Sequence, residues 1–578
     1  MNQIQARTAN VRGRQMPLTA EDLFKQGVRL HGEGDIESAE AAYRAALDID
    51  PEHLNATYLL GLAASQTSRP ALARDCLQQY VAQCPQDMQA LSILAVACHD
   101  LCDYEQAEKL LVRAIAGGMD SSAVHFNLGK VRQMLGKLDA AVRDFDEAIR
   151  RDPAHIDAYI SRALVLRSAE AWEDAAATLE HAILLAPYHA ELHFHYGNVM
   201  HDLQDRRAAI DAYETALALK PTHIEAAVNC GNAYRELDDI EQALAHYTRA
   251  LALAPEHPEA RYNKSLALLA DGQLARGWRM YEARLESELT RQKFMGHRPI
   301  RLAREWDGLP IAGSLLVIAE QGLGDQIFFA GMLHDLQDKA GSITVCLDAR
   351  LIPLLSRSYP QMRFVTPDAL AADDHFEAQV YLGSLGRLLR ADANAFGNIR
   401  AAYLKADPQR AAELRSRIKR PGTISCGLTW RSGNPDQGLH KSLSLDQLAQ
   451  ALCLPSLDLV DLQYGPTDAE RAEFYAQHGK SVMHLDEIDN FSDLDGLAAL
   501  IDACDVVLSV SNTTAHLAAA LGKPVIVMLP KSTGLFWYWH RDSDRSPWYP
   551  TAHLFRQSRH GDWHEVIDAV TLTLAGVA

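Results

Sequence analysis

Three polar segments in the second half of this 578-residue chain carry side chains that could bind and activate a substrate. The first, residues 319–330, reads AEQGLGDQIFFA. Gly322 and Gly324 let the backbone pass close to a ligand and permit positive φ. Asp325 is expected at a helix start, where a carboxylate is favoured, so it is either a proton acceptor or only an N-cap. Glu320, at the preceding strand end, is a second candidate catalytic carboxylate.

The second segment is a basic loop, residues 427–445, with the sequence GLTWRSGNPDQGLHKSLSL. Arg431, His440 and Lys441 are cations at the carboxyl end of an expected strand, and glycines make the loop compact. Such a loop in an acidic protein is suited to a phosphate group. The alternative is a solvated loop whose basic residues pair with nearby acids.

The third segment, residues 509–525, reads SVSNTTAHLAAALGKPV and joins an apolar strand to an alanine-rich helix. Ser511, Asn512, Thr513 and Thr514 lie at the helix start, where free amides and hydroxyls form an anion pocket. His516 falls on the first turn and could cap the helix, contact a ligand or simply pack.

Together the three segments describe a phosphate-bearing donor site opposite a proton acceptor, which indicates group transfer to a hydroxyl. The predicted donor-binding residues are Gly322, Gly324, Arg431, Lys441, Ser511, Asn512, Thr513, Thr514 and His516. The predicted catalytic residues are Asp325 and Glu320.

The elements that must position these residues alternate between apolar strands and helices from about residue 315 onward, which is typical of parallel α/β sheets. The alternation breaks near residue 421 and then restarts. We therefore expect two doubly wound, Rossmann-like domains, residues 300–420 and 421–578. Ligands of such sheets bind at the carboxyl ends of the strands.

The first half has a 34-residue repeat in a single register, with a small residue at Gly27, Gly61, Ala95, Gly129, Ala163, Gly197, Gly231 and Ser265. A small residue follows twelve positions later and a large apolar one four beyond that. This is the tetratricopeptide (TPR) pattern of paired antiparallel helices. We expect a disordered lead at residues 1–19 and an α-solenoid of about eight repeats at residues 20–290.

A solenoid of this kind offers a concave surface to a partner. The positions expected to face the groove and bind the backbone of a protein acceptor include Asn127, His195, Asn198, Asn229, Asn232 and Asn263. Side-chain amides can bind an extended peptide without reading its sequence. The alternative is that these asparagines only pack between helices.

Net charge, apolar runs and cysteine spacing exclude several classes of protein. The formal net charge of −19 is unsuited to general nucleic-acid binding, which requires neutralisation of phosphates. The N-terminus has no apolar segment typical of a secretory signal, and no apolar run is long enough to span a membrane. The nine scattered cysteines include no CxxC pair, which favours a reducing, cytoplasmic setting.

From about Trp306 to the end, the chain resembles the GT-B glycosyltransferases, in particular the bacterial TPR-fused group related to heptosyltransferases and protein O-GlcNAc transferase. The matching motifs include AEQGLGDQIFFA, GLTWRSGNP with the later HKSL, LQYGP, SNTTAHLAAALGKPV and SPWYPTAHLFRQ. The resemblance implies a GT-B module in which residues 300–420 form the acceptor-side domain and residues 421–578 the donor domain.

The resemblance also implies roles for single residues. Asp325 matches a general base, Lys441 a contact to donor phosphate, and Thr513 and Thr514 a diphosphate pocket. Many relatives have aspartate in place of Asn512, and the TPR-fused group commonly has arginine in place of Lys441. The implied reaction is an inverting displacement from a CMP- or UDP-linked sugar, with no metal ion and no further cofactor.

The TPR-fused group includes flagellin glycosyltransferases that use nonulosonic acids such as pseudaminic acid, so flagellin is an expected partner. Two alternatives stay open. One is protein or polysaccharide transfer of the UDP-GlcNAc type. The other is a non-catalytic TPR adaptor with a degenerate transferase domain, for which Asn512 is the supporting feature.

Overall fold

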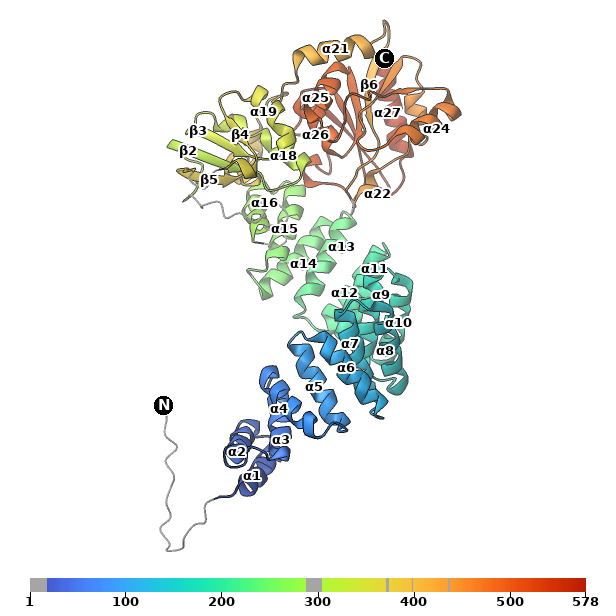
Figure 1. Cartoon of the computed structure of the whole chain (residues 1–578). Coiled ribbons are helices and arrows are strands. Elements are labelled where there is room, and N and C mark those ends of the chain that lie inside the picture. The colour runs from blue at the N-terminus through green and yellow to red at the C-terminus, as the bar shows by residue number, and fades with distance from the viewer. Residues whose placement is uncertain (1–17, 287–303, 371–373, 398, 435–436, 578) are drawn as a thin grey trace. The chain divides into compact units, whose positions relative to one another are not determined.

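The computed structural model describes residues 18–286, 304–370, 374–397, 399–434 and 437–577 (Figure 1). The predicted disordered lead lies outside the described residues except for Leu18 and Thr19. Thr19 is the N-cap of the first helix, in a capping box with Asp22, so this residue belongs with the first repeat helix rather than with the lead. The predicted junction between solenoid and α/β part also lies largely outside them.

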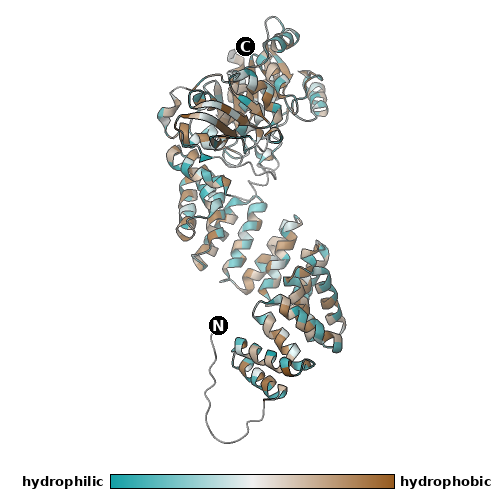
Figure 2. Cartoon of the chain, turned by 60° about the vertical axis from the view of Figure 1, so that its left-hand side comes forward, coloured by the Kyte–Doolittle hydropathy of each residue, from teal (hydrophilic) through white to brown (hydrophobic). Residues whose placement is uncertain are grey.

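The 34-residue repeats fold as predicted, into consecutive pairs of helices. Figure 2 shows hydrophobic and hydrophilic residues interspersed along these helices. The helices are α1 Ala20–Gly32, α2 Ile36–Ile49, α3 Leu54–Gln66, α4 Pro70–Gln83, α5 Met88–Asp100, α6 Tyr104–Ala116, α7 Ser122–Met134, α8 Leu138–Arg151, α9 Ile156–Ser168, α10 Trp172–Leu185, α11 Ala190–Asp202, α12 Arg206–Leu219, α13 Ile224–Glu236, α14 Ile240–Leu253, α15 Pro258–Ala270 and α16 Leu274–Tyr281. The turn η1, Glu282–Leu285, follows α16.

The register glycines explain why the helices of a pair pack so closely. A Cβ added at Gly27 would lie 2.5 Å from the Tyr43 ring, and one at Gly231 would lie 2.7 Å from the Tyr247 ring. Real Cβ atoms are not found so close, so the large residue of the second helix occupies the space that the glycine leaves. The small residue and the large one sixteen positions later are therefore a single packing unit.

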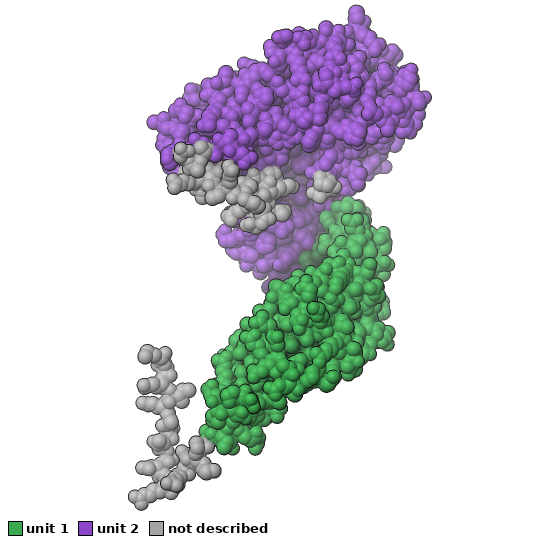
Figure 3. Space-filling model, in the orientation of Figure 1, with its two compact units in different colours: residues 1–220 green, residues 221–578 purple. Residues whose placement is uncertain are grey.

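The chain divides into two compact units, residues 1–220 and 221–578, shown in separate colours in Figure 3. The first unit contains α1–α12. The second contains α13–α16 together with both β-sheets. The last two helix pairs therefore share a compact unit with the predicted catalytic region.

The first sheet of the second unit has five parallel strands in the order β1-β5-β2-β3-β4. Its strands are β1 Arg304–Glu305, β2 Ile311–Ile318, β3 Ala340–Cys346, β4 Arg363–Val365 and β5 Ala378–Tyr381. Its helices are α18 Leu323–Ala330, α19 Ile352–Ser358 and α20 Leu385–Leu389. Its 3-10 turns are η2 Leu333–Leu336, η3 Ala349–Leu351, η4 Pro367–Ala369, η5 Leu382–Ser384 and η6 Ala393–Phe396.

The second sheet has six parallel strands in the order β11-β10-β9-β6-β7-β8. Counted from β6, this is the order 3-2-1-4-5-6 of doubly wound, dinucleotide-binding sheets. The strands are β6 Ile424–Thr429, β7 Leu457–Asp461, β8 Val482–Met483, β9 Val506–Val510, β10 Val525–Leu529 and β11 Ala552–Arg556. The helices are α21 Pro408–Ile418, α22 Gly438–Lys441, α23 Ala449–Leu452, α24 Asp468–His478, α25 Leu494–Ala503, α26 Thr513–Ala520 and α27 His564–Val577, and the turn η7 is Trp537–Trp539.

The predicted α/β alternation is therefore confirmed, with two local differences. The segment LSLDQLAQAL, predicted as a helix, is helical only over the four residues of α23, because its first half packs as turns. Helix α21, assigned by sequence to the first domain, packs against α25 of the second. Its last turn also binds Asp505 of the second domain through Arg415.

A continuous apolar core connects the last repeat with both sheets. Trp278 of α16 is almost fully buried, packs edge-on against Trp537 and Trp548, and donates a hydrogen bond to the carbonyl oxygen of Arg390. The core extends from Leu269 in α15 through α18 and α25 to α26. The final helix pair is thus anchored on the α/β part by burial of large aromatic side chains.

Within the described ranges, no helix combines the length and the apolar character needed to cross a membrane.

Candidate functional site

The candidate site lies where helices from the two sheets meet end to end. Helix α18 follows β2, and α26 follows β9, so both begin at carboxyl ends of parallel strands. A Cβ added at Gly324 would lie 3.3 Å from Cδ2 of His516 and 3.6 Å from Oγ1 of Thr513. A side chain at position 324 would therefore crowd His516, and the glycine eases this close approach. Neither Gly322 nor Gly324 uses the positive φ that glycine permits, and Gly322 has a φ of −63°.

A cavity of about 410 Å³ opens beside this contact. Its walls include most of the predicted donor residues. They are Gly322, Gly324, Lys441, Ser511, Asn512, Thr513, Thr514 and His516, together with Asp325. The structure therefore brings the first and third polar segments together with Lys441 and residues 432–434 of the second.

Lys441 is the only lysine that lines this cavity among the described residues. Its side chain is almost fully buried, and its Nζ lies 4.5 Å from the centroid of the Phe536 ring. No carboxylate of the described chain forms an ion pair with it. Burial lowers the pKa of Lys441 to about 8, against an opposing effect of Asp325. A buried ammonium without a counter-ion is suited to binding an anionic ligand group.

The start of α26 forms a second wall of the cavity. Asn512 is the N-cap, and its Oδ1 accepts a hydrogen bond from the Ala515 amide at 3.1 Å. Its Nδ2 donates to Thr429 and to the carbonyl oxygen of Arg431. An ionised aspartate could not make the last two bonds, so Asn512 has a structural role that accounts for the amide. Thr513 and Thr514 then present the first helix amides to the cavity.

Asp325 is the most strongly perturbed carboxylate of the site. Burial, followed by the like charge of Glu320, raises the pKa of Asp325 to about 7, against the opposing effect of Lys441. Asp325 lies in the first turn of α18, but the N-cap is Gly322, so the interpretation of Asp325 as only an N-cap is wrong. A carboxylate that titrates near neutral pH can accept a proton during a reaction.

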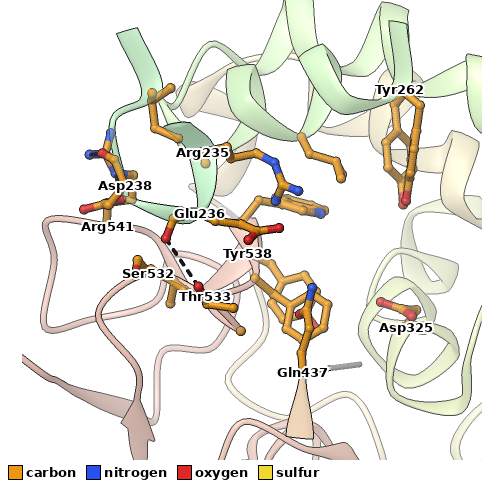
Figure 4. A pocket seen from close by; sticks show the side chains of 18 of the residues that line it. Arg235, Glu236, Asp238, Tyr262, Asp325, Gln437, Ser532, Thr533, Tyr538 and Arg541 are labelled. Carbon is orange, nitrogen blue, oxygen red and sulfur yellow. Dashed lines mark hydrogen bonds and ion pairs between the residues drawn. The ribbon is translucent and has the colours of Figure 1, made fainter. Parts of the chain in front are cut away.

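A second cavity, of about 260 Å³, also reaches Asp325 (Figure 4). One wall consists of residues from α13 and α15, including Arg235 and Tyr262, and the opposite wall is the loop around Ser532 and Thr533. Asp325 therefore separates a cavity that contains Lys441 from one bordered by the last repeats.

Glu320 does not line either cavity within the described residues. It is almost fully buried and forms an ion pair of 2.9 Å with Arg284 from the turn after α16. Arg284 also donates to Ser384. The geometry does not support the prediction that Glu320 contacts a substrate. Although Glu320 is paired with Arg284, its charge still raises the pKa of Asp325.

His516 and Ser511 line the cavity, but both side chains form hydrogen bonds with neighbouring side chains of the protein. The Nδ1 of His516 lies 2.9 Å from the Tyr549 hydroxyl, and its ring stacks on Trp539. Burial, followed by the charge of Lys441, lowers the pKa of His516 to about 3, so the ring is neutral at pH 7. Ser511 accepts a hydrogen bond from the Trp539 indole.

Arg431 does not reach the cavity. Its guanidinium lies against Glu470 and donates to the carbonyl oxygen of Pro466. The structure therefore contradicts its prediction as a phosphate ligand and favours the alternative, a basic residue paired with a nearby acid. Only its backbone contributes, through the hydrogen bond from Asn512.

The predicted groove asparagines differ in their environments. Asn198 accepts a hydrogen bond from Tyr213, and Asn232 accepts one from Tyr247, so both carbonyl oxygens pack inside a helix pair. For these two residues the packing alternative holds. Asn127 and His195 lie in the first unit, whereas Asn229 and Asn263 lie on α13 and α15 of the second. Their role in acceptor binding stays a prediction.

Sequence reasoning missed Asn490, which lies in the loop before α25. Its Nδ2 donates to the carbonyl oxygens of Asp461 and Gln463, and its buried Oδ1 has no partner among the described residues. Asn490 lines the larger cavity, whose mouth is bordered by Arg350 stacked on Phe491. The loop follows a two-residue strand, β8, so no strand-and-glycine pattern marked it.

Family models for tetratricopeptide repeats match residues 24–88, 100–156, 126–190, 190–223 and 231–272. The chain is 28% identical over 568 residues to Protein FlbA of Caulobacter vibrioides, covering 94% of this chain and 82% of that protein. A solved repeat protein from Parabacteroides merdae aligns at 15% identity with a TM-score of 0.36, over 43% of this chain and 98% of its own. A solved MamA protein aligns at 20% identity with a TM-score of 0.27, over 31% and 97% of the two chains. The chain thus contains tetratricopeptide repeats followed by an α/β region with parallel sheets.

Proposed function

We propose that the α/β region is an inverting glycosyltransferase of the GT-B arrangement, which transfers a sugar from a nucleotide donor to a hydroxyl of a protein bound by the repeats. The observation that carries the proposal is the position of Asp325. It borders two cavities, and only the larger contains the buried, unpaired Lys441. Sugar transfer requires a base that lies next to both the bound donor and the acceptor hydroxyl. A carboxylate bordered by a donor cavity on one side and an acceptor cavity on the other would meet this requirement.

The larger cavity is proposed as the donor site. Lys441 and the first amides of α26 would neutralise the phosphate of the leaving nucleotide. This assignment of charge requires no metal ion. The unpartnered Oδ1 of Asn490 would accept a hydrogen bond from the nucleoside, either from a ribose hydroxyl or from a base N–H.

The reaction follows from this arrangement. The Asp325 carboxylate removes the proton of a Ser or Thr hydroxyl, and the resulting oxygen attacks the anomeric carbon. The new C–O bond forms as the bond from that carbon to the phosphate oxygen breaks. The nucleotide leaves with the electron pair of that bond, stabilised by Lys441, and the configuration at the anomeric carbon is inverted.

We further propose flagellin as the acceptor and a CMP-linked nonulosonic acid as the donor. This step rests on the resemblance of the α/β motifs and the repeat arrangement to flagellin glycosyltransferases. The match to Protein FlbA covers 94% of this chain and therefore extends over both the repeats and the α/β region. A UDP-linked N-acetylhexosamine donor is the alternative within the same mechanism.

The donor is identified by thermal unfolding with CMP-, UDP-, GDP- and ADP-sugars. A ligand at ~100 times its dissociation constant stabilises the folded state by ~2.7 kcal/mol, which is readily measured. We expect one nucleotide class to stabilise the protein and Lys441→Ala to abolish the effect. Absence of stabilisation by all four classes would contradict the proposal.

Catalysis is tested with Asp325→Asn. We expect its kcat to fall by about 10²–10⁴-fold, because a general base contributes that factor, while donor affinity is retained. Mass spectrometry of flagellin, incubated with donor and enzyme, measures transfer. Equal transfer by Asp325→Asn and the unchanged protein would contradict the role of Asp325 as the base. Absence of transfer by the unchanged protein with every donor would leave only a non-catalytic adaptor that binds partners through its repeats.

A further inference from the structure

The smaller cavity contains a positive charge that the proposed reaction does not use. Arg235, from the last turn of α13, lines this cavity together with Tyr262 and Asp325. Figure 4 shows the guanidinium directed toward the space between the helices and the opposite loop. The buried Nε–H has no hydrogen-bond partner in the described part of the chain.

The surroundings of Arg235 leave one of its donors unused. The Arg235 side chain forms a hydrogen bond with Tyr247, and the charge of Glu236 also favours the protonated guanidinium. Asp238 instead binds Arg541, whose Nε donates to the Asp238 carboxylate and whose Nη2 donates to the Asp238 main-chain carbonyl oxygen, both at 2.7 Å. The Nε–H of Arg235 remains without a partner among the described residues. A guanidinium in this state can donate hydrogen bonds to oxygen atoms of a bound molecule.

The wall that carries Arg235 is held in place. The Arg541–Asp238 pair fixes the turn between α13 and α14 to the loop that follows β10. The Thr533 hydroxyl donates to the carbonyl oxygen of Glu236 in the same region. Arg235 is therefore presented from a fixed helix end, opposite the side from which Asp325 enters.

The composition of the cavity favours a polypeptide over an anion. Lining side chains include hydrogen-bond donors and acceptors, namely Arg235, Glu236, Gln321, Gln437, Ser532 and Thr533, and three tyrosines. Glu236 and Asp325 would repel a strongly anionic ligand. At about 260 Å³ the cavity is below the ~300 Å³ typical of the smallest drug-sized sites, so it suits one side chain with its adjoining backbone.

We infer that Arg235 binds main-chain carbonyl oxygens of the acceptor polypeptide next to the Ser or Thr that is modified, and so places its hydroxyl against Asp325. This inference rests on the proposed function and names the acceptor class of the same site. Recognition through the backbone reads no side chain, so the acceptor sequence around the hydroxyl can vary. The last repeats thereby form part of the acceptor site itself.

The test uses the full chain and a degenerate nonapeptide pool centred on Ser, with the stabilising nucleotide-sugar as donor. We expect Arg235→Ala to raise the KM for the pool at least tenfold, with donor affinity unchanged and transfer recovered at high peptide concentration. Arg235→Lys should give an intermediate KM, because it retains charge but loses the planar fork. Arg279→Ala, on the exposed side of α16, is the matched control.

Thermal unfolding of each variant separates a binding defect from misfolding, and Arg235→Lys provides a second measurement if the alanine variant does not fold. Equal KM values for Arg235→Ala and Arg279→Ala would overturn the inference. So would transfer to a free monosaccharide acceptor but never to the peptide pool. Failure of the proposed function has a different signature, namely no transfer by the unchanged protein to any acceptor, whatever residue stands at position 235.

Discussion

At the residue scale, the site depends on two buried charges of opposite sign that act on each other. Burial raises the pKa of Asp325 to about 7 and lowers that of Lys441 to about 8, and each partner opposes the shift of the other. The proposed proton transfer requires ionised Asp325, whereas the proposed phosphate binding requires protonated Lys441. The two requirements overlap only in a narrow range around neutral pH.

We therefore expect a bell-shaped pH dependence of kcat/KM. Activity should rise as Asp325 loses its proton near pH 7 and fall as Lys441 loses its proton near pH 8. Because kcat/KM reports on the free enzyme, the two limbs belong to the interacting pair. Lys441→Arg should remove the alkaline limb, since arginine stays protonated. A flat profile from pH 5 to 10 would show that neither group titrates during catalysis.

How far residues could be predicted depended on their local setting. Asp325, Lys441 and Thr513 lie in loops or helix starts just after apolar strands, and this pattern is visible in the sequence. Arg235 and Asn490 could not be found in this way, because one lies in an ordinary repeat helix and the other follows a two-residue strand. Glu320 and Arg431 are residue types suited to a catalytic or phosphate-binding role. Each instead forms an ion pair with a residue distant in sequence, Arg284 and Glu470 respectively, and the sequence pattern does not reveal these pairs.

At the scale of elements, the turn after the last repeat helix is connected to the loop that carries Glu320 and Asp325. Trp278 packs on α20, where a Cβ added at Gly386 would lie 2.4 Å from its ring. A Cβ at Gly383 would lie 2.5 Å from Oε1 of Glu320. Two glycines of one short segment thus make room for the repeat cap and for the ion pair that neutralises Glu320.

We expect Gly386→Ala to destabilise the second unit by about 1–3 kcal/mol, because the added methyl group overpacks a fully buried indole. Gly576→Ala is the matched control, since a Cβ at this position meets nothing within 4 Å. Chemical denaturation of both variants measures the difference. Equal stability of the two variants would show that Trp278 can shift without cost, and that the cap is not rigidly docked.

Strands and helices were largely predictable because apolar runs and the 34-residue register repeat along the chain. The short edge elements were not. Strands β1 and β8 contain only two residues each, too few for any alternation to show. Strand β11 follows the segment SPWYP, whose tryptophan, tyrosine and prolines interrupt the apolar pattern that would predict a strand.

At the scale of the whole molecule, every described residue that lines either cavity belongs to residues 221–578. The first unit contains twelve helices of the repeat series and none of the cavity walls. Its contribution to the proposed reaction is therefore separable from the chemistry. A repeat array that binds the partner protein raises the local concentration of the hydroxyl at Asp325, without altering the transfer step.

This division predicts the behaviour of a chain that lacks residues 1–220. The second unit has its own continuous core, which includes α15 and α16, so we expect it to fold alone. Donor affinity and kcat for the Ser-centred peptide pool should match those of the full chain. Transfer to intact flagellin at low concentration should fall by about 10²–10⁴-fold, the range that tethering supplies. Adding residues 1–220 as a separate chain should not restore it, because a partner held elsewhere gains no proximity. If the shortened chain modified flagellin as fast as the full chain, the first twelve helices would have no role in acceptor capture.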